Sequence, residues 1–231
     1  MFPSSMLKGK KILIIAPHPD DEAIGCGGII MLAKQKQAKV LVLFMSVGYS
    51  RQLVTKQTNA DKRIKETDKA AKYGNFTYKI AFQGKQFMRL DTVPQKELIE
   101  KIEDTSYDFK PDIVCIPFRY SFDQDHRAVS TASITAFRPL PQSLTHQPRI
   151  ILEYEEPYSW TTDKQFLPNF YINISSVIKE KIMLLKQHKT QLRKDPFPRS
   201  PKNLQRIAGI RGAEIGIAYA ESYSLLREQW V

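Results

Sequence analysis

The stretch Lys10–Gly28, K-K-I-L-I-I-A-P-H-P-D-D-E-A-I-G-C-G-G, joins a short apolar run to one histidine and three acidic residues. Its apolar part, Ile12–Ala16, predicts a strand covered on both faces, because the hydrophobic residues are continuous rather than alternating. The segment Ala23–Gln37 that follows the acidic residues predicts a helix. A buried strand leading directly into a helix is the beginning of a parallel α/β fold.

The same alternation of strand and helix continues along the chain. Further strands are expected at Val40–Met45, Tyr78–Phe82, Ile113–Pro117 and Arg149–Tyr154. Helices are expected between them, at Thr58–Tyr73, Gln95–Thr105 and His126–Phe137. This order predicts an α/β fold, with residues 1–231 as a single Rossmann-like domain whose mostly parallel sheet is flanked by helices. From about residue 174 onward two helices, Ile174–Arg193 and Pro201–Leu226, are expected to form a helical C-terminal extension.

Composition restricts the function classes. With 42% hydrophobic and 26% charged residues, the chain has the make-up of an ordinary globular protein. The net charge of +11 raises the question of nucleic acid, but the basic residues are scattered and form no recognisable nucleic-acid module. Attraction of an anionic substrate, or peripheral contact with a membrane surface, stays open. No apolar run approaches the roughly 20 residues that span a bilayer, so a cytoplasmic protein is expected. Cys26 and Cys115 are expected to be buried free thiols.

The acidic cluster after the first strand is a candidate metal site. His18 and Asp21 are three residues apart, so one turn can direct both side chains to a single point, and imidazole with carboxylate is a normal ligand set for Zn²⁺. Asp20 would point elsewhere and act as general base on a nearby water. A cation would also offset the repulsion that Glu22 adds. The alternative is a plain helix cap, which explains the acids but not a histidine between two prolines.

A second candidate cluster follows the expected strand Ile113–Pro117. Because ligands bind beyond the carboxyl ends of parallel strands, Asp123, Asp125 and His126 are expected near the first cluster. His126 would be the third ligand of a catalytic zinc, which keeps one open position, and Asp125 would orient a metal-bound imidazole. Alternatively, Asp123 caps the next helix and His126 merely lies in its first turn.

The other two histidines are expected outside the metal site. His146 is predicted to lie at the surface, and His188 is predicted to pack or form a hydrogen bond on a helix.

At the two clusters the sequence resembles the LmbE-like, or PIG-L-like, family of N-acetylglucosaminyl deacetylases. The family pattern A-H-P-D-D-E is matched by P-H-P-D-D-E at Pro17–Glu22, and H-x-D-H is matched in part by D-Q-D-H at Asp123–His126. Weaker matches are Arg63-x-x-Glu66 and R-G-A-E-I-G-I-A-Y-A-E at Arg211–Glu221. The run from F-L-P-N-F through H-K-T-Q-L to P-F-P-R-S resembles bacterial members tied to surface-sugar biosynthesis, so the resemblance covers nearly the whole chain.

The resemblance implies a hydrolase that depends on Zn²⁺, or another divalent metal, and removes acetyl from an N-acetylated amino sugar. The sugar would be free, nucleotide-linked or lipid-linked, and the setting surface-polysaccharide or glycoconjugate biosynthesis. His18, Asp21 and His126 would match the family's metal ligands and Asp20 its general base. Arg63 would match an arginine that contacts the substrate.

One departure from the family pattern concerns Asp123, which stands where the family usually has histidine. An ionised Asp cannot donate a hydrogen bond to an oxyanion, so stabilisation would fall mainly on the metal. Asp20 would then serve first as base and later as acid. Asp20, Asp123 and Asp125 are therefore the predicted catalytic residues, with the role of Asp123 left open.

Three alternatives remain open from the sequence. The first is a metal-dependent amidase or carbamoyl hydrolase with a non-sugar substrate, which the pocket loops would decide. The second is a degenerate carbohydrate-binding homologue without activity, which the retention of His18, Asp20, Asp21 and His126 disfavours. The third is a basic nucleic-acid-binding protein, which a steep dependence of affinity on salt would support. The sequence does not identify the sugar, its carrier, the physiological metal or the oligomeric state.

Overall fold

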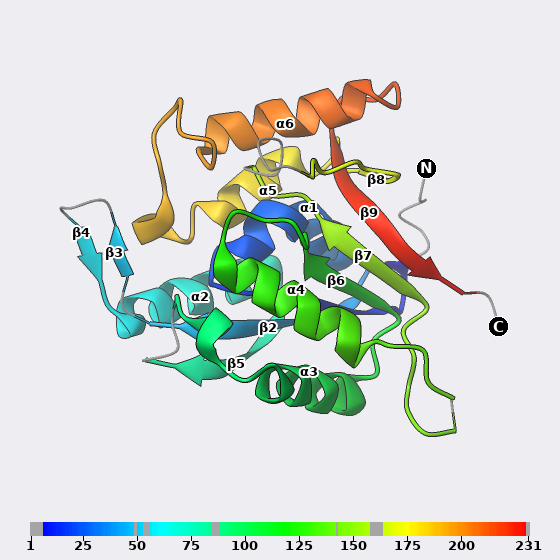
Figure 1. The fold of residues 1–231 in the computed structure, drawn as a ribbon. Coiled ribbons are helices and arrows are strands. Elements are labelled where there is room, and N and C mark those ends of the chain that lie inside the picture. The colour runs from blue at the N-terminus through cyan, green and yellow to red at the C-terminus, as the bar shows by residue number, and fades with distance from the viewer. Residues whose placement is uncertain are drawn as a thin grey trace.

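The computed structural model describes residues 7–48, 50–52, 56–84, 88–141, 143–157 and 164–229. Its main sheet has seven strands in the order β5-β2-β1-β6-β7-β9-β8. In chain order these are β1 (Lys11–Ala16), β2 (Lys39–Val47), β5 (Thr77–Gln83), β6 (Ile113–Pro117), β7 (Ile150–Tyr154), β8 (Phe170–Asn173) and β9 (Ala220–Glu228). Short strands β3 (Ser50–Gln52) and β4 (Lys56–Thr58) pair separately. The described α-helices flank the main sheet (Figure 1) and are α1 (Asp21–Gln35), α2 (Ala60–Gly74), α3 (Gln95–Phe109), α4 (Gln124–Ala136), α5 (Ile178–Leu185) and α6 (Pro201–Ala213).

The sheet has the mostly parallel architecture that the sequence predicts. β5, β2, β1, β6 and β7 pair in parallel, whereas β9 pairs antiparallel with both β7 and β8. The chain moves outward from β1 to β2 and β5, then crosses back to place β6 on the other side of β1. In open α/β sheets this reversal opens a crevice at the carboxyl ends of the two central strands. The expected site residues follow β1 and β6, so the topology brings them to one edge.

The central strand β1 is buried on both faces, as its continuous apolar run indicates. Ile12 and Ile14 face the layer of α1, α2, α5 and α6, while Leu13 and Ile15 face α3 and α4. These four side chains are inaccessible to solvent. Each contributes on the order of 1.5–3 kcal/mol through burial, so β1 and the turn that follows it are firmly anchored.

Helix α1 is buried along most of its length, because it lies between the sheet and α5 (Figure 1). Two glycines allow the neighbouring elements to approach. A Cβ atom on Gly25 would lie 2.2 Å from Cδ2 of Tyr154, and one on Gly28 would lie 2.4 Å from Cγ2 of Ile174. No side chain fits at these positions without movement of its neighbours, so G-C-G-G places α1 close to β7 and to the segment after β8.

The C-terminal part differs from the expected pair of helices. The predicted helix Pro201–Leu226 is wrong beyond Ala213, where α6 ends, and Ala220–Glu228 forms β9 instead. Gly212 approaches the carbonyl oxygen of Ile217 so closely that a Cβ atom would lie 2.6 Å from it, and Gly216 has φ of +73°. The chain therefore reverses at these glycines and enters the sheet.

The other predicted C-terminal helix, Ile174–Arg193, is shorter than expected. α5 covers Ile178–Leu185, and a 3₁₀ turn, η3, follows at Lys189–Gln191.

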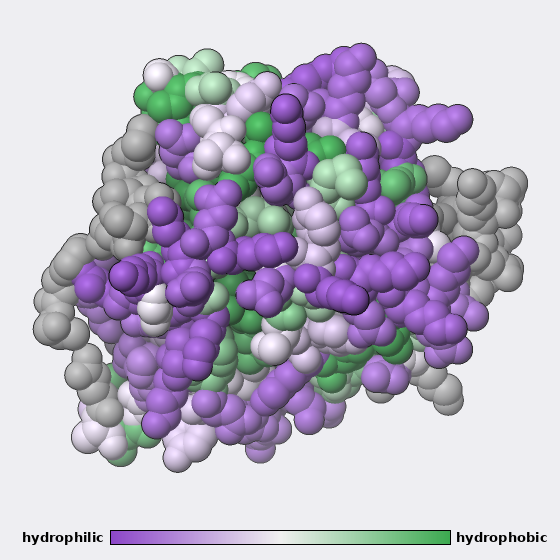
Figure 2. Space-filling view, turned by 180° about the vertical axis from the view of Figure 1, so that it is seen from behind, coloured by the Kyte–Doolittle hydropathy of each residue, from purple (hydrophilic) through white to green (hydrophobic). Residues whose placement is uncertain are grey.

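One face of the surface and the two cysteines can be compared with the composition. The face in Figure 2 is largely hydrophilic, with apolar residues in separate groups. Cys26 and Cys115 are buried and free, as predicted. Among the described helices, none is both long enough and apolar enough to cross a membrane.

Candidate active site

The turn between β1 and α1 is folded by its own acidic side chains. The backbone N–H of His18 donates to Oδ2 of Asp21 at 2.9 Å, and the N–H of Asp20 donates to Oε2 of Glu22 at 2.9 Å. Asp20 has φ of +113° and ψ of −24°, a conformation that residues other than glycine rarely adopt. The acidic residues therefore shape the turn besides offering carboxylates to a site.

Asp21 lies between the two predicted metal-binding histidines. Its Oδ2 is 3.6 Å from Nδ1 of His18 and 3.2 Å from Nε2 of His126. All three side chains are buried. Burial alone would raise the pKa of Asp21, but the imidazoles outweigh burial and hold that pKa well below its usual value. Asp21 is thus an ionised carboxylate between two imidazoles, and the three predicted ligands are brought together.

Each imidazole is held on its far side by another carboxylate. Nε2 of His18 lies 2.9 Å from Oδ2 of Asp125, and Nδ1 of His126 lies 2.6 Å from Oε1 of Glu156. Asp125 is fixed in turn by the backbone N–H of Leu90, which donates to Oδ1 at 2.9 Å. A carboxylate in this position fixes the orientation of each imidazole and determines which ring nitrogen is available to a metal.

The carboxylates around the two imidazoles raise their pKa values. Burial alone would lower the pKa of His18, but its hydrogen bonds with Asp125 and Asp21 outweigh burial. The pKa of His126 is raised well above its usual value, because Asp21 and Glu156 outweigh the opposing effect of burial. Without a metal, both rings therefore hold a proton more tightly than a free imidazole does.

Glu156 was not among the residues expected from the sequence. It follows β7 by two positions, and its Oε2 accepts a hydrogen bond from Oγ of Ser121 at 2.6 Å. β7 lies beside β6, so its carboxyl end reaches the same edge as the expected clusters. The rule that placed His126 near His18 would have found Glu156 as well, because E-Y-E-E-P ends a predicted strand.

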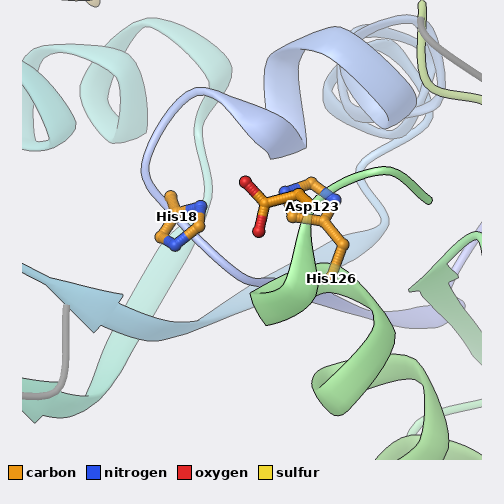
Figure 3. A group of neighbouring side chains, drawn as sticks. All are labelled: His18, Asp123 and His126. Atoms are coloured by element: carbon orange, nitrogen blue, oxygen red, sulfur yellow. The ribbon is translucent and has the colours of Figure 1, made fainter. Parts of the chain in front are cut away.

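Asp123 has two contacts that bear on its role. It is the N-cap of α4, where its side chain accepts the N–H of Asp125 at 2.8 Å, so the capping interpretation is confirmed. Its carboxylate also points toward His18 in Figure 3, and potential ligand atoms of His18, Asp123 and His126 all lie within 4.8 Å of one another. The Asp123 carboxylate therefore lies close to the imidazoles of both His18 and His126.

The proposed general base, Asp20, is buried between two arginines. Nη2 of Arg63 is 3.7 Å from its Oδ1, and Nη1 of Arg199 is 3.2 Å from its Oδ2. Arg63 also donates to the carbonyl oxygen of Pro19 at 2.7 Å. Burial raises the pKa of Asp20, although Arg199 and Arg63 oppose it. Arg199, in the run P-F-P-R-S, was not singled out from the sequence, because nothing in its local pattern indicates a partner so distant along the chain.

The remaining two histidines are not in the cluster of His18, Asp21 and His126. His188 is buried, and its Nε2 is 2.6 Å from Oε1 of Glu22, so the predicted hydrogen bond is confirmed. It lies between α5 and η3 rather than within a helix. His146 is exposed.

The donor set fits a divalent metal of the zinc type. Oδ2 of Asp21 lies within 3.6 Å of one nitrogen of each buried imidazole, and a carboxylate contacts the other nitrogen of each ring. Nitrogen and carboxylate ligands with such outer partners are the pattern of catalytic zinc sites.

Comparison with known proteins gives concordant matches. The profile of the family described as PIG-L: GlcNAc-PI de-N-acetylase matches residues 13–137. Diacetylchitobiose deacetylase of Thermococcus kodakarensis is 28% identical over 227 residues, covering 92% of this chain and 81% of that protein.

Solved structures agree in fold. N,N'-diacetylchitobiose deacetylase from Pyrococcus horikoshii, complexed with its inhibitor MPG, matches with TM-score 0.75 and 23% identity, covering 94% of this chain and 84% of that one. GalB, the 4-carboxy-2-hydroxymuconate hydratase of Pseudomonas putida KT2440, matches with TM-score 0.77 and 17% identity, covering 96% and 98%. A hydratase among the matches means that the fold alone does not decide the reaction.

Proposed function

The chain belongs to the PIG-L family of de-N-acetylases, and from that premise we propose that it is a metal-dependent hydrolase that removes the acetyl group from an N-acetylated amino sugar. One observation carries the proposal: Asp21 lies between the imidazoles of His18 and His126, with Asp20 next to it in the chain. The relative named diacetylchitobiose deacetylase supports the same class of reaction.

His18, Asp21 and His126 would hold the metal, Zn²⁺ or another divalent ion, and Asp123 faces the same point. When bound, such an ion acts as a Lewis acid toward the acetamide carbonyl and lowers the pKa of water. Asp125 and Glu156 keep the two imidazoles in the orientation that this requires. Protons must leave both rings when a metal binds, because their carboxylate partners raise the pKa of each.

Asp20 moves the proton in the proposed reaction. It takes a proton from the attacking water and then delivers it to the nitrogen of the leaving amine. Burial raises the pKa of Asp20, which suits a group that must accept a proton and hold it briefly. Arg63 and Arg199 oppose that rise and favour the ionised form in which the reaction begins.

Asp123 gives this site a different character from one with histidine at the same place. As an ionised carboxylate it accepts hydrogen bonds only, so it is suited to a donor such as the amide N–H of the substrate. We assign Asp125 a positioning role, because it contacts His18 and the backbone of Leu90.

The substrate we propose is an N-acetylhexosamine that is free or attached to a nucleotide or lipid carrier, within surface-polysaccharide or glycoconjugate biosynthesis. The net charge of +11 favours substrates with an anionic carrier. We expect no nucleic-acid partner and place the reaction in the cytoplasm.

The deciding experiment measures bound metal and then acetate release from a panel of free, nucleotide-linked and lipid-linked N-acetylhexosamines. We expect metal in the wild type and acetate from at least one member. Asp20→Asn should keep the metal and lose activity by about 10²–10⁴-fold, the usual contribution of general acid–base catalysis. Asp91→Asn, at an exposed aspartate outside the site, is the matched control and should behave as wild type.

A metal-free wild type that releases acetate, or an Asp20→Asn variant with undiminished turnover, would refute the mechanism. Hydrolysis of simple amides or carbamoyl compounds without any release from amino sugars would instead favour the non-sugar alternative.

A further inference from the structure

The Asp20 backbone is held in an unfavourable conformation by contacts that the mechanism has not used. With φ of +113°, Asp20 lies in a region that residues other than glycine rarely occupy. Such a conformation persists only when the surroundings determine it. The direct restraint is Glu22, whose Oε2 accepts the N–H of Asp20 at 2.9 Å.

Glu22 is itself fixed from a distant part of the chain. Its side chain is inaccessible to solvent, and its second oxygen, Oε1, lies 2.6 Å from Nε2 of His188. His188 is 1% exposed and follows α5, at a separation of 166 residues. A carboxylate with one oxygen on a buried ring and the other on a backbone N–H has little freedom to rotate.

The same segment also reaches Asp20 directly. Nη1 of Arg199 donates to Oδ2 of Asp20 at 3.2 Å, so residues 188–199 contact both the backbone restraint and the carboxylate of one residue. Between these two contacts, Thr190 donates from Oγ1 to Oε2 of Glu66, a residue of α2, at 2.6 Å. The segment is therefore tied to the body of the protein independently of its contacts with the turn.

From this geometry we propose that His188 is a positioning residue for the reaction: through Glu22 it holds the Asp20 peptide so that the Asp20 carboxylate faces the attacking water. The proposal rests on the proposed function, in which Asp20 moves the proton. His188 touches neither the expected metal ligands nor the substrate in this account. Its effect is transmitted by two hydrogen bonds, from His188 to Glu22 and from the Asp20 N–H to Glu22.

The test compares His188→Leu, which removes the donor, with His188→Gln, whose side-chain amide can still donate to Glu22. Thr190→Val is the matched control, because it removes a partly buried hydrogen bond between the same segment and α2. For each variant kcat, KM, bound metal and the urea midpoint are measured. A small displacement of a catalytic group costs up to about 10²-fold in rate.

We expect His188→Leu to lower kcat by about 10- to 100-fold with KM and metal content unchanged. His188→Gln should recover most of that loss, and Thr190→Val should keep kcat even where its urea midpoint falls. A wild-type kcat in His188→Leu, no recovery in His188→Gln, or an equal loss in Thr190→Val would overturn the proposal. If His188→Leu does not fold, Glu22→Ala replaces it: this variant removes the carboxylate that forms both hydrogen bonds, so kcat should fall there too.

Hydrogen exchange of the Asp20 amide separates this proposal from the proposed function. Its N–H is protected by Glu22, so exchange should accelerate in His188→Leu and stay unchanged in Thr190→Val. If the wild type releases no acetate from any substrate while exchange responds in this way, the positioning of the turn stands and the reaction must be reassigned. Unchanged exchange in His188→Leu rejects the positioning role whatever the activity.

Discussion

Asp20, Asp21 and Glu22 are adjacent in the chain, yet each carboxylate has different partners. Asp21 faces the imidazoles of the expected metal site, Glu22 faces His188, and Asp20 faces two arginines. Buried charges are tolerated only when they are paired and hydrogen-bonded, and this division provides a pair for each. Protein side chains therefore offset the crowding of the three acidic residues, the crowding for which the sequence alone suggested a cation.

The two contacts of Asp123 can be separated by substitution. Asp123→Asn keeps an oxygen that can cap α4 but removes the negative charge, whereas Asp123→Ala removes both. We expect Ala to lower the free energy of unfolding by about 1 kcal/mol and Asn to leave it nearly unchanged. If the carboxylate takes part in the reaction, kcat should fall by about tenfold or more in both variants, within the usual range for a polar group that contacts the reacting atoms.

Urea denaturation and acetate release on the same samples would check both expectations. Full activity in Asp123→Asn would leave Asp123 as a helix cap alone.

Much of the site could be predicted because its residues follow two neighbouring parallel strands. His18 and Asp21 come directly after β1, while Asp125 and His126 come shortly after β6, so the sheet alone brings them together. Glu156 was within reach of the same rule. Arg199 was not, because it lies in an irregular segment whose position depends on the packing of α5 and α6 rather than on a local pattern.

Helix α1 carries the first site residues and depends on close approach to β7. Gly25→Ala would place Cβ 2.2 Å from Cδ2 of Tyr154, whose hydroxyl donates to the carbonyl oxygen of Ile15. We expect this overpacking to lower the free energy of unfolding by about 1–3 kcal/mol. Gly209→Ala, on α6, is the control: its Cβ would meet nothing nearer than Cε1 of Tyr219 at 3.8 Å, so better helix propensity should stabilise by up to about 1 kcal/mol.

Urea unfolding of Gly25→Ala and Gly209→Ala would measure both expected changes in the free energy of unfolding. Equal stability of Gly25→Ala and the wild type would mean that the Tyr154 ring moves aside freely.

At the level of elements, continuous apolar runs identified the parallel strands, but they could not identify β9. Its residues, A-E-S-Y-S-L-L-R-E, mix polar and apolar side chains and begin only a few residues after α6 ends at Ala213. The chain reverses direction between α6 and β9 at Gly212 and Gly216. The need for glycine at position 212 is clear only from the structure, in which the backbone of Ile217 packs against it. Local periodicity does not reveal such a tertiary contact.

Across the whole molecule, three buried histidines have raised pKa values. For His188 burial would lower the pKa, but Glu22 outweighs burial, and the same sign holds for His18 and His126. Because the folded pKa lies above the unfolded value of 6.5, the stabilisation is fully present below pH 6.5 and is lost as pH rises through the folded pKa. Folding that makes a ring bind its proton about tenfold more tightly gains about 1.4 kcal/mol in this way.

The metal-free protein should therefore lose stability as pH rises from 6.5, as measured by urea unfolding in excess chelator. With saturating Zn²⁺ the loss of stability should be smaller or reversed. The metal binds the neutral imidazoles of His18 and His126 in place of a proton, and this binding stabilises the folded state. His188→Gln removes one of the three groups and should flatten the metal-free profile. A metal-free profile that stays flat above pH 6.5 would contradict the pairing of these rings with carboxylates.

Strand β9 joins β8 to the rest of the main sheet, since β8 pairs with β9 and β9 pairs with β7. On the ribosome β8 is synthesised well before its partner β9. Between the two strands the ribosome must still synthesise α5, the segment with His188 and Arg199, and α6. The parallel strands β5, β2, β1, β6 and β7 can assemble earlier, because all five end by Tyr154, before β9 is synthesised. The nascent chain is thus expected to hold an exposed strand edge on β7 for a period, which is the stage at which a chaperone would be most useful.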